Sequence, residues 1–153
     1  MDNYPKIVSD VDLFLQLINR KNKIIVFTNG CFDLLHEGHL YLLKEAKKLG
    51  DILIVAVNTD DSIKKLKGNS RPIESLETRL NKLLKLNEVD FVIPFSEDIP
   101  LQLIQKIQPT ILVKGGDYKK EEIVGNNIIE EVVIIPLLEG FSTTQIIQSK
   151  QNC

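Results

Sequence analysis

The 153-residue sequence has no apolar run long enough to cross a membrane, and it has only two cysteines. A membrane-spanning helix needs roughly 20 consecutive apolar residues, and the acidic N-terminal segment lacks a signal-peptide pattern. Two cysteines are too few for a disulfide framework or a cysteine metal cluster. Lys and Arg number 19 against 21 Asp and Glu, so the positive charge typical of nucleic-acid binders is also missing. These absences predict a cytoplasmic protein without a membrane or nucleic-acid partner.

What is present is ordinary for a soluble globular protein, with 43% hydrophobic and 26% charged residues. The length suits one domain, and we expect a single domain over residues 1–153. Short apolar runs alternate with segments whose apolar residues recur at helical spacing. This alternation predicts an α/β fold: a Rossmann-like open sheet of about five parallel strands with helices on both faces. The expected strands are Lys23–Phe27, Ile52–Val57, Val89–Phe95, Thr110–Val113 and Glu130–Pro136. The expected helices are Asp10–Asn19, His36–Gly50, a segment after Ser62, Glu74–Leu86, Pro100–Ile107 and a segment beginning at Ser142.

The stretch between the first strand and its helix carries the strongest functional pattern. Gly30 and Gly38 allow close backbone approach to a ligand, and the helix start offers N–H groups to an anion. His36 and His39, the only histidines, are three residues apart and share one face of the first turn. We interpret the two imidazoles as hydrogen-bond donors to phosphate oxygens, because histidine can carry a positive charge near neutral pH. Two alternatives stay open: structural caps of the helix, and a zinc site, which the ligand number and spacing disfavour.

The pattern Gly30-x-Phe32-Asp33-x-x-His36-x-Gly38-His39 resembles the HxGH signature of the cytidylyltransferase-like nucleotidylyltransferases. The resemblance extends from about Ile24 to Ser149, and it implies transfer of a nucleotidyl group from an NTP to a phosphorylated acceptor. It implies that His36 and His39 stabilise the transition state and that Lys44 neutralises the phosphates. It further implies Mg²⁺ bridging the phosphates, with no protein ligand identified, and a homodimer. The implied nucleotide contacts are Thr28, Asn29, Gly30, Cys31, Phe32, Asp33, Gly38, Ser142, Thr143 and Thr144.

A second segment, Val113-Lys-Gly-Gly-Asp-Tyr118, resembles the branch of that family that adenylylates heptose 1-phosphate. This implies that ATP and D-glycero-β-D-manno-heptose 1-phosphate give ADP-heptose and pyrophosphate, a step toward lipopolysaccharide or related glycans. No kinase portion is present, so the stand-alone form is expected. Alternatives are a cytidylyltransferase for a small phosphorylated alcohol such as glycerol 3-phosphate, an FMN adenylyltransferase, and a nucleotide-sensing module without turnover. Leu137-Leu138 stands where related cytidylyltransferases carry Arg-Thr.

Further candidates lie at expected strand ends and in basic loops. Lys114, Gly115 and Asp117 follow the fourth strand and are expected to contact nucleotide or sugar. Weaker candidates for substrate contacts are Asn58, Asp60, Arg71, Arg79 and Tyr118. Three of these candidates have a structural alternative: helix capping by Asp60 or Asp61, a solvated charge run around Arg71, and an exposed ion pair for Arg79. Cys31 is expected to be a small packed thiol rather than a nucleophile.

Overall fold

The computed structural model of the protein describes residues 6–96, 100–116, 123, 125, 127–129 and 131–136. Its five strands form one parallel sheet in the order β3-β2-β1-β4-β5. The strands are β1 Ile25–Gly30, β2 Ile52–Asn58, β3 Phe91–Phe95, β4 Ile111–Gly115 and β5 Glu131–Ile135. The predicted open parallel sheet is confirmed.

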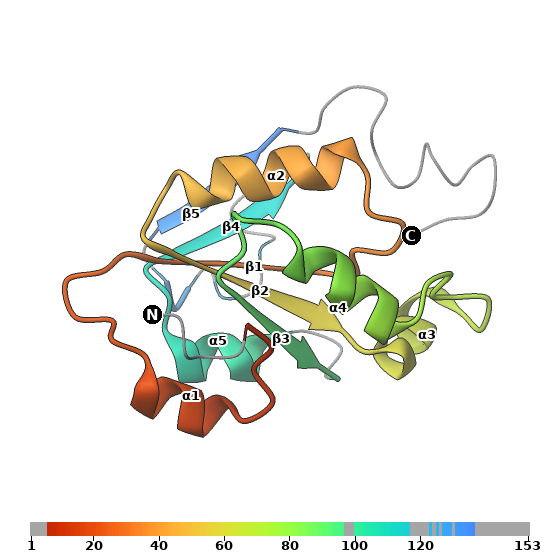
Figure 1. Ribbon diagram of the computed structural model, residues 1–153, viewed down its shortest axis with the longest axis horizontal. Helices are drawn as coiled ribbons and strands as arrows, with labels where there is room; N and C mark the ends of the chain where they lie inside the picture. The colour runs from red at the N-terminus through yellow and green to blue at the C-terminus, as the bar shows by residue number, and fades with distance from the viewer. Residues whose placement is uncertain are drawn as a thin grey trace.

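Helices cover both faces of this sheet (Figure 1). Figure 1 shows α1 (Val11–Leu17) and α5 (Leu101–Ile107) below the strands, and α2 (Glu37–Lys47) and α4 (Leu76–Leu84) above them. The short helix α3 (Asp60–Lys67) follows β2 directly and lies beyond its carboxyl end. The two-layer cover that the sequence predicts is therefore present in the described part of the chain.

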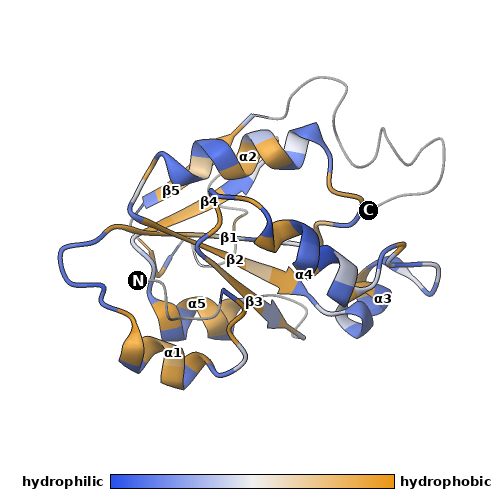
Figure 2. Cartoon of the chain, in the orientation of Figure 1, coloured by the Kyte–Doolittle hydropathy of each residue, from blue (hydrophilic) through white to orange (hydrophobic). Residues whose placement is uncertain are grey.

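The core consists of two apolar layers, one on each face of the sheet. Successive strand residues point to opposite faces, so Phe27 of β1 packs in the α1/α5 layer while Val26 packs in the α2/α4 layer. All seven residues of the inner strand β2 are buried. Figure 2 shows the result as largely apolar strands between helices that carry both apolar and polar residues. Burial on both faces explains why these strands read as continuous apolar runs.

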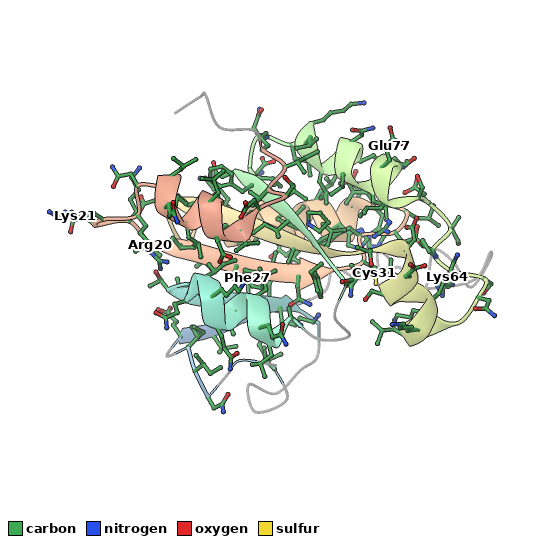
Figure 3. The ribbon with its side chains drawn as sticks, turned by 90° about the horizontal axis from the view of Figure 1, so that it is seen from below. Arg20, Lys21, Phe27, Cys31, Lys64 and Glu77 are labelled. Atoms are coloured by element: carbon green, nitrogen blue, oxygen red, sulfur yellow. The ribbon has the colours of Figure 1, made fainter. Side chains whose placement is uncertain are left out.

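The strand order creates a switch point between β1 and β4. The chain leaves β1 toward β2 and β3, then crosses to the other side of β1 to form β4. In open parallel sheets, ligands bind in the crevice where the order reverses, outside the carboxyl ends of the strands. Figure 3 shows Cys31 and Lys64 toward this end of the molecule and Arg20 and Lys21 toward the opposite end. The fold therefore brings the loop after β1 to the position where a ligand is expected.

Several predicted boundaries are wrong by a few residues. Strand β1 continues to Gly30, so residues 28–30 are strand rather than loop. Helix α2 ends at Lys47, before Gly50. Thr59, rather than Asp60 or Asp61, caps α3, because its side chain accepts from the Ser62 N–H. The helix predicted from Ser142 lies outside the described residues.

Gly50 is required for packing rather than for ending the helix. A Cβ atom there would lie 2.8 Å from the carbonyl oxygen of Ile24 and 2.8 Å from Cγ2 of buried Val26. Distances this short force the backbone to move. The glycine therefore allows the turn after α2 to pass close to the start of β1.

We predict that Gly50→Ala lowers the free energy of unfolding by about 1–3 kcal/mol, the usual cost of overpacking. Urea unfolding measures this loss. The slope of the unfolding free energy against urea concentration should not change if the folded and unfolded states keep their compactness. The control is Lys48→Ala, because the Lys48–Glu45 pair is largely exposed and exposed pairs contribute roughly 0–1 kcal/mol. Equal stability of Gly50→Ala and the wild type would contradict the packing role.

Candidate active site

The two histidines cap helix α2 and hold each other in place. His36 is the N-cap residue, and its Nδ1 accepts from the Gly38 N–H at 3.0 Å. His39 is the third helical residue, and its Nδ1 accepts from the His36 N–H at 3.2 Å. Their rings stack with centroids 3.9 Å apart. This is the reciprocal arrangement of a capping box, made by two imidazoles instead of Ser and Glu.

The capping bonds determine where each imidazole carries its proton. A nitrogen that accepts from a backbone N–H is unprotonated, so the proton of each neutral ring is on Nε2. Both rings can therefore act as Nε2–H donors toward an anion while Nδ1 supports the helix. The capping role and the phosphate role, which the sequence left as alternatives, are compatible.

Burial keeps these rings neutral. It lowers the pKa of His36, and burial together with the nearby His36 lowers the pKa of His39 to about 3. Both shifts favour neutral rings near pH 7 rather than the positive charge that the sequence allowed there. The described residues include no group of three or more His, Cys, Asp or Glu side chains that could hold a metal ion, so the zinc alternative gains no support there.

The structure does not bring Lys44 to the histidine pair. Lys44 is exposed in the last turn of α2. It lies five residues beyond His39, about 7.5 Å along the axis and about 140° around it, at 1.5 Å and 100° per residue. The phosphate-neutralising role predicted for Lys44 is therefore disfavoured.

The stretch from Thr28 to Leu34 is largely buried rather than an open cradle. Thr28 is buried in β1, and its Oγ1 has no hydrogen-bond partner in the described structure. The Phe32 ring packs into the α2/α4 layer, 3.1 Å from where a Cβ of Gly30 would lie. Phe32 and Leu34 have φ values of 52° and 54°, a region unfavourable for large side chains. Such strain persists where the surroundings impose it.

Asp33 fastens this loop to the segment before α4. It is 1% exposed, and its two carboxylate oxygens accept from the N–H groups of Ile73 and Glu74 at 2.7 and 2.8 Å. In return, Glu74 accepts from the Leu34 N–H at 3.0 Å and pairs with Lys82. The Asp33 carboxylate is thus committed to the protein, and a direct nucleotide contact from it is disfavoured.

Arg79 ties together the loops that follow β1 and β2. Its side chain is 0% exposed, so the exposed ion pair considered from the sequence is wrong. The guanidinium donates to the carbonyl oxygens of Cys31 and Asn58 at 2.8 and 2.7 Å and to the Asp60 carboxylate at 2.7 Å. A further bond joins Nε to the Glu74 carbonyl at 3.1 Å. Arg79 therefore positions the site loops, and its donors face protein groups rather than a substrate.

The residues after β2 are also tied into the fold. The buried Asn58 side chain donates to the Ser62 hydroxyl at 2.9 Å, and its Oδ1 lies 4.0 Å from the Cys31 sulfur. The Asp60 side chain remains 40% exposed while it pairs with Arg79. Both Asn58 and Asp60 are predicted substrate contacts. Only the Asp60 side chain of these two is accessible to a ligand.

Lys114 and Gly115 end β4 beside the switch point. Burial lowers the pKa of Lys114, the neighbouring Cys31 opposes this shift, and Lys67 adds to it. Lys114 is thus influenced electrostatically by the loop after β1 and by the basic end of α3. A Cβ on Gly115 would lie 3.4 Å from Leu42 of α2. Lys114 therefore lies at the end of the strand beside β1, and its contact with nucleotide or sugar stays a prediction.

Arg71 is buried in the turn before α4, and its backbone N–H donates to the Gly68 carbonyl. The predicted contacts Asp117, Tyr118, Ser142, Thr143 and Thr144 lie outside the described residues. Asn29, Gly30 and Cys31 are half-buried where β1 ends, and Gly38 is buried with its N–H donated to His36.

Sequence reasoning did not single out Glu74 or Lys67. Glu74 receives bonds from residues 40 positions earlier and eight later, and no local pattern signals such a role. Lys67 belongs to the run Lys64-Lys65-x-Lys67 before Gly68. Lys67 differs from Lys64 and Lys65 because it acts on the pKa of Lys114. A strand order with β4 beside β1 could have suggested that Lys67 and Lys114 interact.

A parallel sheet with two neutral histidines at its switch point defines a nucleotidyl-transfer site of the HxGH type. Residues 27–149 match the family described as Cytidylyltransferase-like, and the chain belongs to this family of nucleotidyltransferases.

Two curated relatives are similar over nearly the whole chain. The chain is 54% identical over 147 residues to "Bifunctional protein HldE" of Helicobacter hepaticus, covering 96% of this chain and 30% of the relative. It is 48% identical over 145 residues to the HldE of Helicobacter pylori strain J99, covering 95% of this chain and 31% of that one. The chain thus spans about a third of the length of these relatives.

Solved structures show the same architecture. The lipopolysaccharide core biosynthesis protein from Thermoplasma volcanium is 33% identical, with a TM-score of 0.65, covering 76% of this chain and 99% of that one. Pantothenate synthetase from Thermus thermophilus, at 19% identity and a TM-score of 0.64, covers 88% of this chain and 62% of that one and shares the fold. In the described part of the chain, no helix is long and apolar enough to span a bilayer.

We predict that Arg79→Met costs about 2–4 kcal/mol of stability and most of the activity, since each buried carbonyl left unpaired costs about 1–3 kcal/mol. Lys85→Met, an exposed change near the end of the same helix, is the matched control and should alter stability by less than about 0.5 kcal/mol. Urea unfolding and pyrophosphate release measure the two effects. A fully stable, active Arg79→Met protein would contradict the positioning role.

We also predict a stability loss on acidification that depends on His39. The pKa of His39 in the folded protein, about 3, lies below the ordinary value of 6.5. Between these two pH values the unfolded chain therefore binds more protons than the folded protein. The contribution is fully present above pH 6.5 and is lost as the pH falls toward 3. In His39→Asn, whose Oδ1 can occupy the position of Nδ1, urea midpoints should fall less over this window. Parallel pH profiles of the two proteins would contradict the assignment.

Proposed function

We propose that the protein transfers AMP from ATP to a sugar 1-phosphate, specifically D-glycero-β-D-manno-heptose 1-phosphate, releasing pyrophosphate and forming ADP-heptose. The observation that carries this proposal is the mutual capping of His36 and His39, which places both ring protons on Nε2 at the switch point of the sheet. The choice of acceptor is supported by the similarity to HldE proteins and to a lipopolysaccharide core biosynthesis protein, and by the Val113–Tyr118 segment.

The proposed chemistry is an in-line attack of the sugar phosphate on the α-phosphorus of ATP. Negative charge grows on the oxygens around the α-phosphorus and on the leaving pyrophosphate. Preorganised donors stabilise such charge without reorganising during the reaction. The Nε2–H groups of His36 and His39 supply two such donors, and stacking and capping hold both rings still. The protein therefore contributes by positioning and by charge stabilisation rather than by a covalent intermediate.

Positive charge comes from residues other than Lys44. Lys114 ends β4 beside the switch point, and Cys31 and Lys67 both act on its pKa. We assign Lys114 and Lys67 to the phosphates in place of Lys44, and Ser142, Thr143 and Thr144 remain predicted triphosphate contacts from the family motif. An anion there would stabilise the charged form of Lys114.

Mg²⁺ is proposed to accompany ATP. Mg²⁺ in phosphoryl-transfer sites commonly keeps several waters and is held by substrate phosphates with one or two carboxylates. In the described residues, Asp33 is committed to backbone N–H groups, while Asp60 keeps an exposed side chain beside the site. Asp60 is thus the carboxylate that fits the role of contacting a hydrated Mg²⁺. A homodimer and a cytoplasmic location are proposed from the family resemblance and the nature of the substrates.

The test crosses ATP, CTP, GTP and UTP with heptose 1-phosphate, glycerol 3-phosphate and FMN, with pyrophosphate release as the readout. We expect release with ATP and heptose 1-phosphate, dependent on added Mg²⁺. Preference for CTP with glycerol 3-phosphate would replace the proposal with a cytidylyltransferase, and binding of ATP without release in any combination would indicate a nucleotide-sensing module.

We predict that His39→Asn reduces turnover by at least about 100-fold, the effect of removing one oxyanion donor. The variant should keep its fold because Asn retains an acceptor for the His36 N–H. Circular dichroism and urea unfolding at pH 7.5 verify the fold, and single-turnover pyrophosphate release measures the chemical step. Near-normal release from the folded variant would refute the assignment of His39 to the transition state.

A further inference from the structure

Arg71 is a buried cation without a counter-ion in the described structure. Its side chain is only 6% exposed, and its NH1 atom is buried with no hydrogen-bond partner. Among the described residues, no ion pair involves its guanidinium. Buried charged groups are normally paired, because leaving one unpaired costs several kcal/mol. The position of Arg71 therefore calls for an anion that the described residues do not supply.

Three carboxylates of the loops around the histidines already have other partners. Asp33 accepts from the backbone of Ile73 and Glu74. Glu74 pairs with Lys82 and accepts from Leu34, and Asp60 pairs with Arg79. Arg71 thus differs from Arg79, whose donors all meet protein acceptors.

The loop that carries Arg71 is fixed against the histidine loop. The Arg71 N–H donates to the Gly68 carbonyl at 3.2 Å, which closes a turn at Gly68, where φ is +100°. Two residues further on, the bonds from Ile73 and Glu74 to Asp33 hold the chain beside Phe32 and Leu34. Arg71 therefore lies on an anchored turn, two residues before the segment that is bonded to Asp33, and Asp33 is three residues before His36.

We propose that Arg71 binds a phosphate group of the substrates at the edge of the HxGH site, with the guanidinium as a fixed, permanently charged anion receptor. This inference rests on the proposed function for the identity of the substrates. Arginine suits the role because its planar fork matches phosphate oxygens and keeps its charge at any working pH. Two sources present this chemistry, the triphosphate of ATP and the phosphate of the sugar, and separate binding experiments distinguish them.

The binding experiment uses the full chain with Arg71→Met and Arg71→Lys. Calorimetry measures Kd for a non-hydrolysable α,β-methylene ATP with Mg²⁺ and, separately, for heptose 1-phosphate. We expect Arg71→Met to weaken one of the two ligands by about 10- to 100-fold, the effect of losing a hydrogen bond to a charged group, and Arg71→Lys to recover part of the loss. Loss for the ATP analogue assigns Arg71 to the triphosphate, and loss for the sugar phosphate assigns it to the acceptor.

A ligand-free melting curve separates this role from a structural one. Replacing an arginine that stabilises the fold lowers the melting temperature. Replacing an unpaired buried arginine with a neutral side chain of similar length leaves the melting temperature unchanged or raises it. We expect the second result for Arg71→Met. The matched control is Lys65→Met, an exposed charge change on α3, which should alter neither binding nor melting.

The outcomes distinguish this proposal from the proposed function. Unchanged affinity of Arg71→Met for both ligands, or a large fall in its ligand-free melting temperature, overturns the assignment even if the wild type produces ADP-heptose. A second outcome is that Arg71→Met binds the ATP analogue more weakly than the wild type does, while the wild type shows no transfer to heptose 1-phosphate. That outcome would support the assignment of Arg71 and reject the proposed reaction.

Discussion

The bonds made by the buried Arg79 guanidinium are the constraint on which the site depends. Strands β1 and β2 are neighbours, but nothing in a sheet fixes the chain after each strand ends. Arg79 reaches from α4 to the carbonyls of Cys31 and Asn58 and to the Asp60 carboxylate. It thereby sets the positions of both loops relative to each other. Asp33 adds a second tie to the start of α4, so the loop before the histidines is held at both ends.

The spacing of the two histidines follows from this support and from helix geometry. The N-cap and the third helical residue are the two positions whose side chains can satisfy each other's backbone groups. Placing imidazoles there leaves Nδ1 for the helix and Nε2 for an anion at the positive end of the helix dipole. A single pattern, His-x-x-His, can therefore meet a structural and a chemical requirement together, so the capping role does not exclude the proposed phosphate role.

The sheet and the helix faces could be predicted from the sequence because local signals determine them. Runs such as Ile52–Val57 are apolar throughout because a central parallel strand is buried on both faces. The glycines and histidines could be placed at a strand end for the same reason. The roles of Asp33 and Arg79 could not be predicted in this way, because their partners lie 40 and 48 residues away in the chain.

The cationic groups proposed for the site differ in how they respond to a ligand: His39 and Lys114 can take up a proton, whereas Arg71 keeps a constant charge. Burial lowers the pKa of His39 and of Lys114, which limits repulsion among clustered cations when no anion is present. A polyanion placed beside such groups favours their charged forms, so its binding is coupled to proton uptake. Arg71 cannot release its proton near neutral pH. Its charge therefore attracts an anion before the others respond, and its burial beside an anchored loop places that attraction at a fixed point.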